Sequence, residues 1–203
     1  MKSKVIAIGL DAAAPDQVEN WIAQGYLSNL NHLKSQGVSG RLTNIEYYRA
    51  ETPWTTFLTG CFPEKTGYWG PQKFHHSNYN VSDIKAYDFQ EYPPFYTLNS
   101  DYRVTVFDMP QTRLCPEVKG LQVLGWGSHS QQGSSCSKPD HLLKEIVDKY
   151  GKHPAYGRDW ANCYDLETIN TLKNRLLTGI SQRSQICQEL LHQDWDFFLT
   201  MFS

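Results

Sequence analysis

Apolar positions along the chain follow two different periods. Residues 4–10, "KVIAIGL", form an apolar run rich in β-branched side chains, a pattern typical of a strand buried on both faces, as in a parallel sheet. Similar runs predict further strands at residues 38–45, 102–110, 120–127 and 195–203. The chain therefore carries several candidate strands that a single sheet can hold.

Helical periodicity separates these runs. After the first strand, apolar residues recur at helical spacing from Pro15, which suits a first helical turn, through a break at Gly25 to an end at Gly37. Further helices are predicted over residues 53–60, 140–151, where Asp140 is the expected N-cap, and 165–193. Strands that alternate with helices predict the α/β class: a three-layer α/β/α sandwich with a mostly parallel, doubly wound sheet. We expect residues 1–203 to form one such domain.

Some segments lack periodicity. Residues 62–100 are rich in Tyr, Pro, Asn and His, and within them residues 68–98 are expected to form a loop-rich insertion of the kind that often carries function. Residues 128–139 predict a polar loop, and the Arg and Lys residues of 173–183 predict a solvated helix face. Any substrate recognition is therefore expected from loops.

Composition narrows the class of protein. The formal net charge is −2, so no basic excess points to a nucleic-acid partner. The five cysteines are odd in number and include no Cys-x-x-Cys pair, which argues against a zinc ribbon or a disulfide framework and suits a reducing compartment. No apolar stretch approaches the ~20 residues of a membrane span, and the N-terminus has no cleavage signal. We expect a cytoplasmic protein without a membrane partner; its oligomeric state stays open.

Two oxygen-bearing side chains stand where a ligand is expected. Asp11 ends the first strand, and ligands of doubly wound sheets bind beyond the carboxyl ends of strands. Thr52 directly precedes Pro53 and a short helix, whose N-terminal N–H groups favour an anionic phosphate. A divalent metal held by Asp11 would lower the pKa of the Thr52 hydroxyl and make it a nucleophile. The alternative is that Thr52 only caps the helix and Asp11 only caps the strand.

Several short motifs follow one another in the order of a known family. They are "VIAIGLDAAAPD" (5–16), Thr52, "LTG" (58–60), "CFPE" (61–64), "KTG" (65–67), "DMPQT" (108–112) and "GLQVLGWG" (120–127). This series resembles the type I phosphodiesterase/nucleotide pyrophosphatase family of the alkaline phosphatase superfamily. The resemblance implies a metal-dependent hydrolase that cleaves a phosphodiester or nucleotide pyrophosphate bond in a small-molecule phosphoester. It also implies two zinc-type ions, with Asp11 a ligand of one and Thr52 bound to the same ion as the nucleophile that forms a phosphothreonine.

The chain departs from the family pattern near the nucleophile. The spacing from Thr52 to the Thr-Gly step at 59–60 is shorter than in the family, so an ungapped match would place Ala50 at the nucleophile position. Thr55 is the other candidate hydroxyl. Thr-Gly at 66–67 replaces the family's His-Gly, which leaves the stabilisation of the developing oxyanion open.

Other side chains are candidates for contact with the substrate. The Asn that binds phosphate in some family members falls near Pro71 here, so Trp69, Gln72 or Lys73 are expected to take its place. His129 follows the predicted strand 120–127 and is a further candidate. The pair His75-His76 is expected to be an exposed loop pair, because adjacent side chains point in different directions.

The family's remaining metal ligands have no counterpart in the sequence. In the family an Asp-x-x-x-His, an Asp-His and a further His follow the strand that matches residues 195–203. Asp11 and Thr52 alone are too few ligands for tetrahedral zinc. We therefore expect the second metal site to be incomplete, the 203-residue chain to be inactive alone, and the chain to be the N-terminal portion of a longer alkaline-phosphatase-like catalytic domain.

Two other interpretations stay open. A non-catalytic binding or interaction protein that retains the fold would account for the absent His and the short nucleophile segment. A sulfatase-like or phosphomutase-like relative on the same fold is the third possibility. "CFPEK" (61–65) is similar to the sulfatase Cys-x-Pro-x-Arg signature, but Lys65 replaces the Arg and Pro63 is expected to mark a helix exit.

Overall fold

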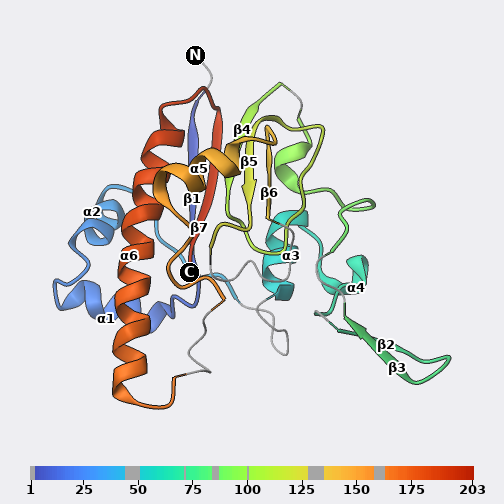
Figure 1. Cartoon of the computed structure of the whole chain (residues 1–203), viewed down its shortest axis with the longest axis horizontal. Helices are drawn as coiled ribbons and strands as arrows, with labels where there is room; N and C mark the ends of the chain where they lie inside the picture. The colour runs from blue at the N-terminus through green and yellow to red at the C-terminus, as the bar shows by residue number, and fades with distance from the viewer. Residues whose placement is uncertain are drawn as a thin grey trace.

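A five-stranded sheet forms the centre of the protein, in a computed structural model that describes residues 3–43, 51–70, 72–83, 87–99, 101–127, 135–157 and 163–203 (Figure 1). The strands lie in the order β1-β7-β4-β5-β6. Their bounds are Val5–Leu10 (β1), Arg103–Phe107 (β4), Lys119–Leu124 (β5), Cys136–Lys138 (β6) and Phe197–Phe202 (β7). The neighbouring pairs β1–β7, β7–β4 and β4–β5 are parallel, and β6 is antiparallel to β5. The strands predicted within 4–10, 102–110, 120–127 and 195–203 are confirmed.

Helices cover both faces of this sheet. Their bounds are Pro15–Ala23 (α1), Ser28–Gln36 (α2), Glu51–Thr59 (α3), Pro63–Thr66 (α4), Phe95–Thr97 (η1), Leu142–Tyr150 (α5) and Leu166–Leu191 (α6). Successive strand residues point to opposite faces. Val106 therefore packs in one cluster with Leu58 of α3, whereas Phe107 packs in another with Ile146 of α5 and Ile186 of α6. The predicted three-layer α/β/α sandwich and its mostly parallel, doubly wound sheet are confirmed.

The first strand differs from its prediction. β1 lies at the edge of the sheet, next to β7, and not between two strands. Its apolar side chains are about half exposed, at 51% for Val5, 50% for Ile6, 60% for Ile8 and 47% for Leu10. The helices α1 and α2 that follow contain no buried residue. The prediction that residues 4–10 are buried on both faces is therefore wrong for the described part of the chain.

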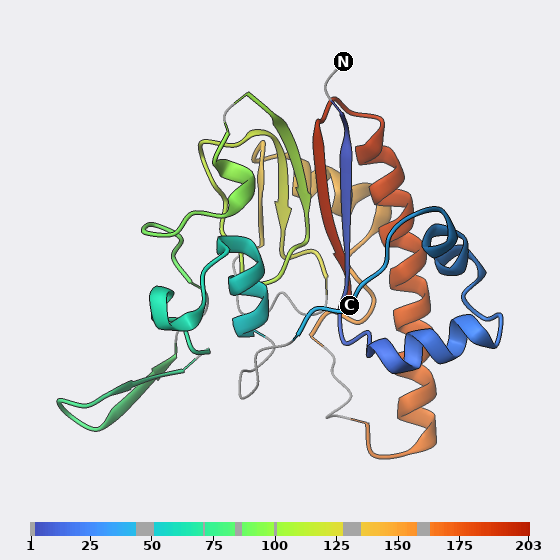
Figure 2. The ribbon, with the colours of Figure 1, turned by 180° about the vertical axis from the view of Figure 1, so that it is seen from behind.

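Other segments also differ from the sequence pattern. Residues 38–43, predicted as part of a strand, are exposed and have no regular structure, and residues 44–45 lie outside the described ones. The predicted polar loop 128–139 contains β6, a strand too short to show a period, while 128–134 lie outside the described part. The insertion 68–98 includes an antiparallel hairpin of β2 (Gln72–His75) and β3 (Asn80–Asp83). The β2–β3 hairpin projects from the body of the protein (Figures 1 and 2).

The long helices have different N-terminal caps. Asp165 caps α6 in a capping box, in which its carboxylate accepts from the Thr168 N–H at 2.8 Å. Asp140, the predicted N-cap of α5, does not cap it, because that helix begins after His141. The hydroxyl of Ser137, on β6, instead accepts from the Leu143 N–H at 2.9 Å. This strand residue therefore satisfies one of the N–H groups at the start of α5.

None of the helices in the described ranges is both long enough and apolar enough to cross a membrane.

Candidate active site

Asp11 lies where the sequence predicted, at the carboxyl edge of the sheet. It directly follows β1, and its backbone N–H donates to the Phe202 carbonyl at 2.8 Å, which extends the pairing of β1 with β7 by one residue. The side chain is half-buried. Figure 2 shows the carboxyl ends of β1 and β7 together at the lower edge of the sheet. Asp108, after β4, and Trp126, after β5, belong to the same edge because these strands are parallel.

Thr52 is fully buried in the first turn of α3. The helix as described begins at Glu51, so Thr52 lies inside it and not ahead of it. The Thr52 hydroxyl donates to the backbone carbonyl of Trp69 at 3.0 Å. This bond points the hydroxyl at the segment after α4 and not at a helix N–H group.

The helix that carries Thr52 packs directly on the strand that leads to Asp11. A Cβ atom placed on Gly9 would lie 3.0 Å from Cη2 of Trp54 and 3.3 Å from Cγ of Met201. Trp54 follows Thr52 by two residues, and Gly9 precedes Asp11 by two residues. The close approach of the indole to a bare glycine therefore brings the two candidate segments together.

Thr55, the alternative nucleophile, is also buried. Its hydroxyl has no hydrogen-bond partner among the described residues. A buried hydroxyl without a partner costs roughly 1–3 kcal/mol of stability. Both candidate hydroxyls thus lie on one helix, three residues apart.

The proposed substrate-contact residues are spread over different places. Trp69 is half exposed and reaches Thr52 through its carbonyl oxygen. Gln72 and Lys73 lie on β2 in the projecting hairpin, where both are exposed. His75, on the same strand, hydrogen-bonds through Nε2 to the Ser82 hydroxyl at 2.7 Å. The position of His129 lies outside the described residues.

A buried ionic cluster at the carboxyl edge of the sheet was not predicted from the sequence. Arg183 of α6 and Asp108 form an ion pair of 2.5 Å, and both side chains are only 2% exposed. The predicted solvated helix face of 173–183 is therefore wrong at Arg183. Asp108 is a carboxylate directly after an apolar strand, the same pattern that identified Asp11 as a candidate. This pattern could therefore have identified Asp108 as well.

A buried histidine completes this cluster. His153 packs edge-on against the Trp126 ring, with 5.0 Å between the ring centroids. Its Nδ1 accepts from the Ala155 N–H at 3.2 Å. Burial, together with the positive charge of Arg183, lowers the pKa of His153 to about 4, while the negative charge of Asp108 acts in the opposite direction. The imidazole is therefore neutral near pH 7.

The described residues do not form a metal site by themselves. No three His, Cys, Asp or Glu side chains within these ranges gather into a group that could hold a metal ion. A structural zinc site takes four protein ligands and a catalytic one three. Asp11 and Thr52 thus fall short of the ligand set that the resemblance implies.

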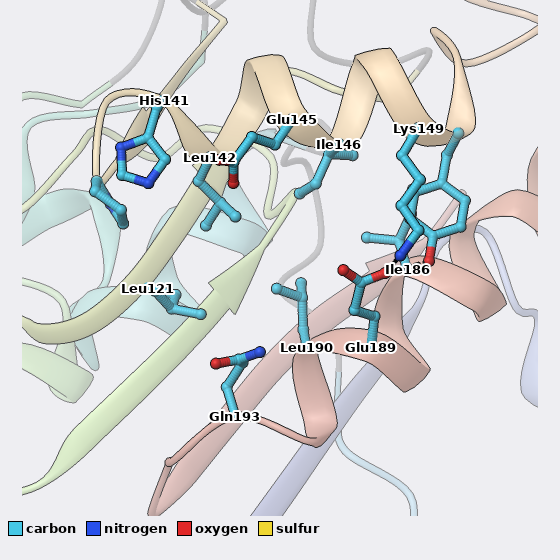
Figure 3. A pocket seen from close by; sticks show the side chains of 12 residues that line it. Leu121, His141, Leu142, Glu145, Ile146, Lys149, Ile186, Glu189, Leu190 and Gln193 are labelled. Atoms are coloured by element: carbon cyan, nitrogen blue, oxygen red, sulfur yellow. Dashed lines mark hydrogen bonds and ion pairs between the residues drawn. The ribbon is translucent and has the colours of Figure 1, made fainter.

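Two pockets lie away from the carboxyl edge. One, of about 260 Å³, lies between α5 and α6 and has an apolar floor with polar side chains such as Glu145 and Gln193 around it (Figure 3). The other, of about 470 Å³, includes Val5, Val104 and Phe197, near the starts of β1, β4 and β7. Neither includes Asp11 or Thr52. Since ligands of such sheets bind at the carboxyl ends of strands, we do not place the reaction in either pocket.

A family model matches nearly the whole chain. It describes type I phosphodiesterase / nucleotide pyrophosphatase proteins and covers residues 5–203. The chain belongs to this family. The phosphodiesterase family match therefore includes both Asp11 and the helix that carries Thr52. No curated protein sequence matches the chain significantly.

Solved structures share the fold of this phosphodiesterase family member. Two crystal structures of phosphonoacetate hydrolase from Sinorhizobium meliloti 1021, in complex with phosphonoformate and with phosphonoacetate, align with TM-scores of 0.60 and 0.62. Sequence identity is 16% in both cases, so the likeness concerns the fold. The alignments cover 98% of this chain and 46% of the hydrolase chain. The chain thus spans about half the length of the proteins that it matches.

Proposed function

We propose that this chain is part of a hydrolase of phosphoric esters that cleaves a phosphodiester or nucleotide pyrophosphate bond. The observation that carries the proposal is the family match over residues 5–203. The packing of Trp54 against Gly9 supports it, because this contact brings the Thr52 helix to the strand that ends at Asp11. In the proposal Thr52 is the nucleophile and Asp11 is a metal ligand.

The proposal sets a condition on Thr52. A threonine hydroxyl attacks phosphorus only when it can lose its proton and reach the substrate. The hydroxyl described here is buried and donates to the Trp69 carbonyl. We therefore propose that the segment around Trp69 moves away when a phosphoester binds, which would expose the hydroxyl. Trp69, Lys73 and His129 are proposed as substrate contacts.

Two metal ions need more ligands than Asp11 and Thr52 can supply. The described part of the chain supplies too few ligands, so we propose that the two divalent ions, zinc in type, are completed by ligands outside it. The 46% coverage of the matched structures is consistent with a longer catalytic domain of which this chain is the N-terminal portion. We expect the 203-residue chain alone to have little activity.

The nucleophile is tested by substitution in the full-length protein. Thr52→Ala is expected to lower turnover of bis-p-nitrophenyl phosphate by at least about 1,000-fold, because loss of the attacking oxygen removes the covalent route. Thr55→Ala tests the alternative hydroxyl in the same assay. Thr59→Ala is the matched control, since Thr59 lies on the same helix and donates to the Thr55 carbonyl. Unchanged turnover in Thr52→Ala would remove this residue from the mechanism.

A binding protein without catalysis is the second candidate. The buried Thr52 hydroxyl and the small number of metal ligands in the described ranges favour it. It predicts no turnover by the full-length protein with zinc, manganese or magnesium, together with measurable binding of a phosphoester by calorimetry. Turnover that depends on an added divalent ion would exclude this candidate.

A further inference from the structure

A buried arginine connects the second half of α6 to the end of the sheet. Arg183 donates from Nη2 to Asp108 Oδ2 at 2.5 Å and from Nη1 to the Met201 carbonyl at 2.7 Å. Its guanidinium also lies over three aromatic rings, with Cζ 5.3 Å from the centroids of Phe107 and Trp126 and 5.6 Å from that of Phe202. A charge held by two hydrogen-bonded partners and three rings in a buried place has one fixed position.

The other member of the ion pair ties two more strand ends together. Asp108 follows β4, and its backbone N–H donates to the Val123 carbonyl of β5 at 2.7 Å. Its Oδ1 accepts from the Trp126 N–H, after β5, at 2.9 Å. A Cβ atom on Gly127 would overlap the Asp108 carboxylate and the Arg183 guanidinium, so the bare glycine leaves room for the pair. The pair thus joins the ends of β4, β5 and β7.

The end of β7 in turn fixes Asp11. The Asp11 N–H donates to the carbonyl of Phe202, the residue after the one that Arg183 holds. β1 is an edge strand whose pairing in the described sheet is with β7. The position of Asp11 therefore depends on where β7 ends.

We infer that Asp108 and Arg183 are positioning residues for Asp11. Their ion pair sets the end of β7, and β7 sets the residue that carries the candidate metal-binding carboxylate. Both side chains are buried, so neither is expected to touch a substrate. The catalytic meaning of the inference rests on the proposed function, whereas the positioning itself can be measured without any activity.

The test replaces the ion pair by apolar side chains. The double variant Asp108→Leu/Arg183→Met is expected to fold, because apolar residues of similar volume often replace a buried ion pair at little cost. It lacks the hydrogen bonds to the Trp126 N–H and the Met201 carbonyl. We expect hydrogen exchange of the Asp11 amide, measured by NMR in the 203-residue chain, to become at least about tenfold faster. In the full-length protein we expect kcat for bis-p-nitrophenyl phosphate to fall on the order of 100-fold, with KM nearly unchanged.

A control and a milder variant complete the experiment. Lys149→Met, on α5, removes an exposed ion pair to Glu189 of α6, the helix that carries Arg183, and should leave both readouts unchanged. Asp108→Asn keeps an acceptor for the Trp126 N–H but lacks the charge, so its Asp11 exchange should lie between the unmodified chain and the double variant.

The outcomes separate this inference from the proposed function. If the unmodified full-length protein does not hydrolyse the diester, the proposed function fails, and Asp11 exchange still decides the inference. Exchange at Asp11 that is unchanged in the double variant would overturn it, as would an Asp11 amide without protection in the unmodified chain. If neither variant folds, the pair is required for the fold as a whole, and the positioning role is also overturned.

Discussion

At the scale of single residues, the carboxyl edge of the sheet is organised by buried charge. Arg183 and Asp108 compensate each other, and His153 stays neutral beside them because burial and the nearby guanidinium disfavour its protonation. A Cβ atom on Gly179 of α6 would overlap the His153 ring, so a second glycine makes room for this cluster. The cluster therefore holds a neutral imidazole near pH 7.

This protonation state predicts a stability that depends on pH. The pKa of His153 is about 4 in the folded protein, against an ordinary value of 6.5. Between these values the unfolded chain binds a proton that the folded chain does not, so stability is full above pH 6.5 and is lost as the pH falls toward 4. The loss attributable to His153 should reach about 3 kcal/mol. Urea unfolding at a series of pH values measures it.

The histidine is isolated by comparing variants. His153→Gln should show a smaller fall in unfolding free energy between pH 7 and pH 4.5 than the unmodified chain, since the titrating group is gone. His32→Gln is the control because His32 is exposed on α2. Parallel pH curves for His153→Gln and the unmodified chain would contradict the assignment.

At the scale of elements, the start of α5 shows how a helix is capped from outside its own sequence. Ser137 on β6 is buried; its hydroxyl donates to the Pro139 carbonyl and accepts from the Leu143 N–H. A cap from a residue six positions away satisfies the same N–H groups as an ordinary N-cap. The strand and the helix are thus stabilised by one hydroxyl.

Two alanine variants distinguish the observed cap from the predicted one. Ser137→Ala should lower the free energy of unfolding by about 1–2 kcal/mol, because the half-buried Leu143 N–H loses its acceptor. Asp140→Ala should change it by less than about 0.5 kcal/mol, since α5 begins after His141 and Asp140 is not its N-cap. Chemical denaturation of both variants at pH 7 gives the comparison. The reverse order would restore Asp140 as the cap.

The sequence predicts elements well where the signal is local. The run at 195–203 and the helix at 165–193 are confirmed because apolar period and capping residues lie within each segment. The strand predicted at 38–45 is wrong over 38–43, since β-branched residues alone do not supply a neighbour to pair with.

The candidate site also contains residues that a local pattern predicts and residues that it does not. Asp11 can be predicted from the sequence because it directly follows an apolar run. Arg183 cannot be predicted in this way, because a charged residue in a helical pattern is typical of the surface. Its partner Asp108 lies 75 residues earlier in the chain. Only the fold brings these two residues together, so no spacing rule reveals the pair.

At the scale of the whole molecule, burial is uneven across the sheet. Val106 and Leu199, on the central strands, are almost fully buried, whereas the apolar side chains of β1 are about half exposed. An exposed, apolar edge strand presents unpaired backbone N–H and C=O groups beside apolar surface, and both promote association with another chain. This arrangement predicts that the 203-residue chain associates through β1 when its concentration is raised.

A charge on this strand should reduce that association. Ile8, at 60% exposed, is the most exposed apolar residue of β1, and Ile8→Lys places a solvated charge beside the edge with little loss of buried area. We expect sedimentation velocity to show a smaller fraction of oligomer for this variant, because a lysine on an edge strand opposes strand addition. Val81→Lys adds the same charge at a residue that is also 60% exposed but lies on β3, in the separate β2–β3 hairpin, so it should leave the oligomer fraction unchanged. An equal reduction by both variants would mean that net charge, and not the β1 edge, governs the association.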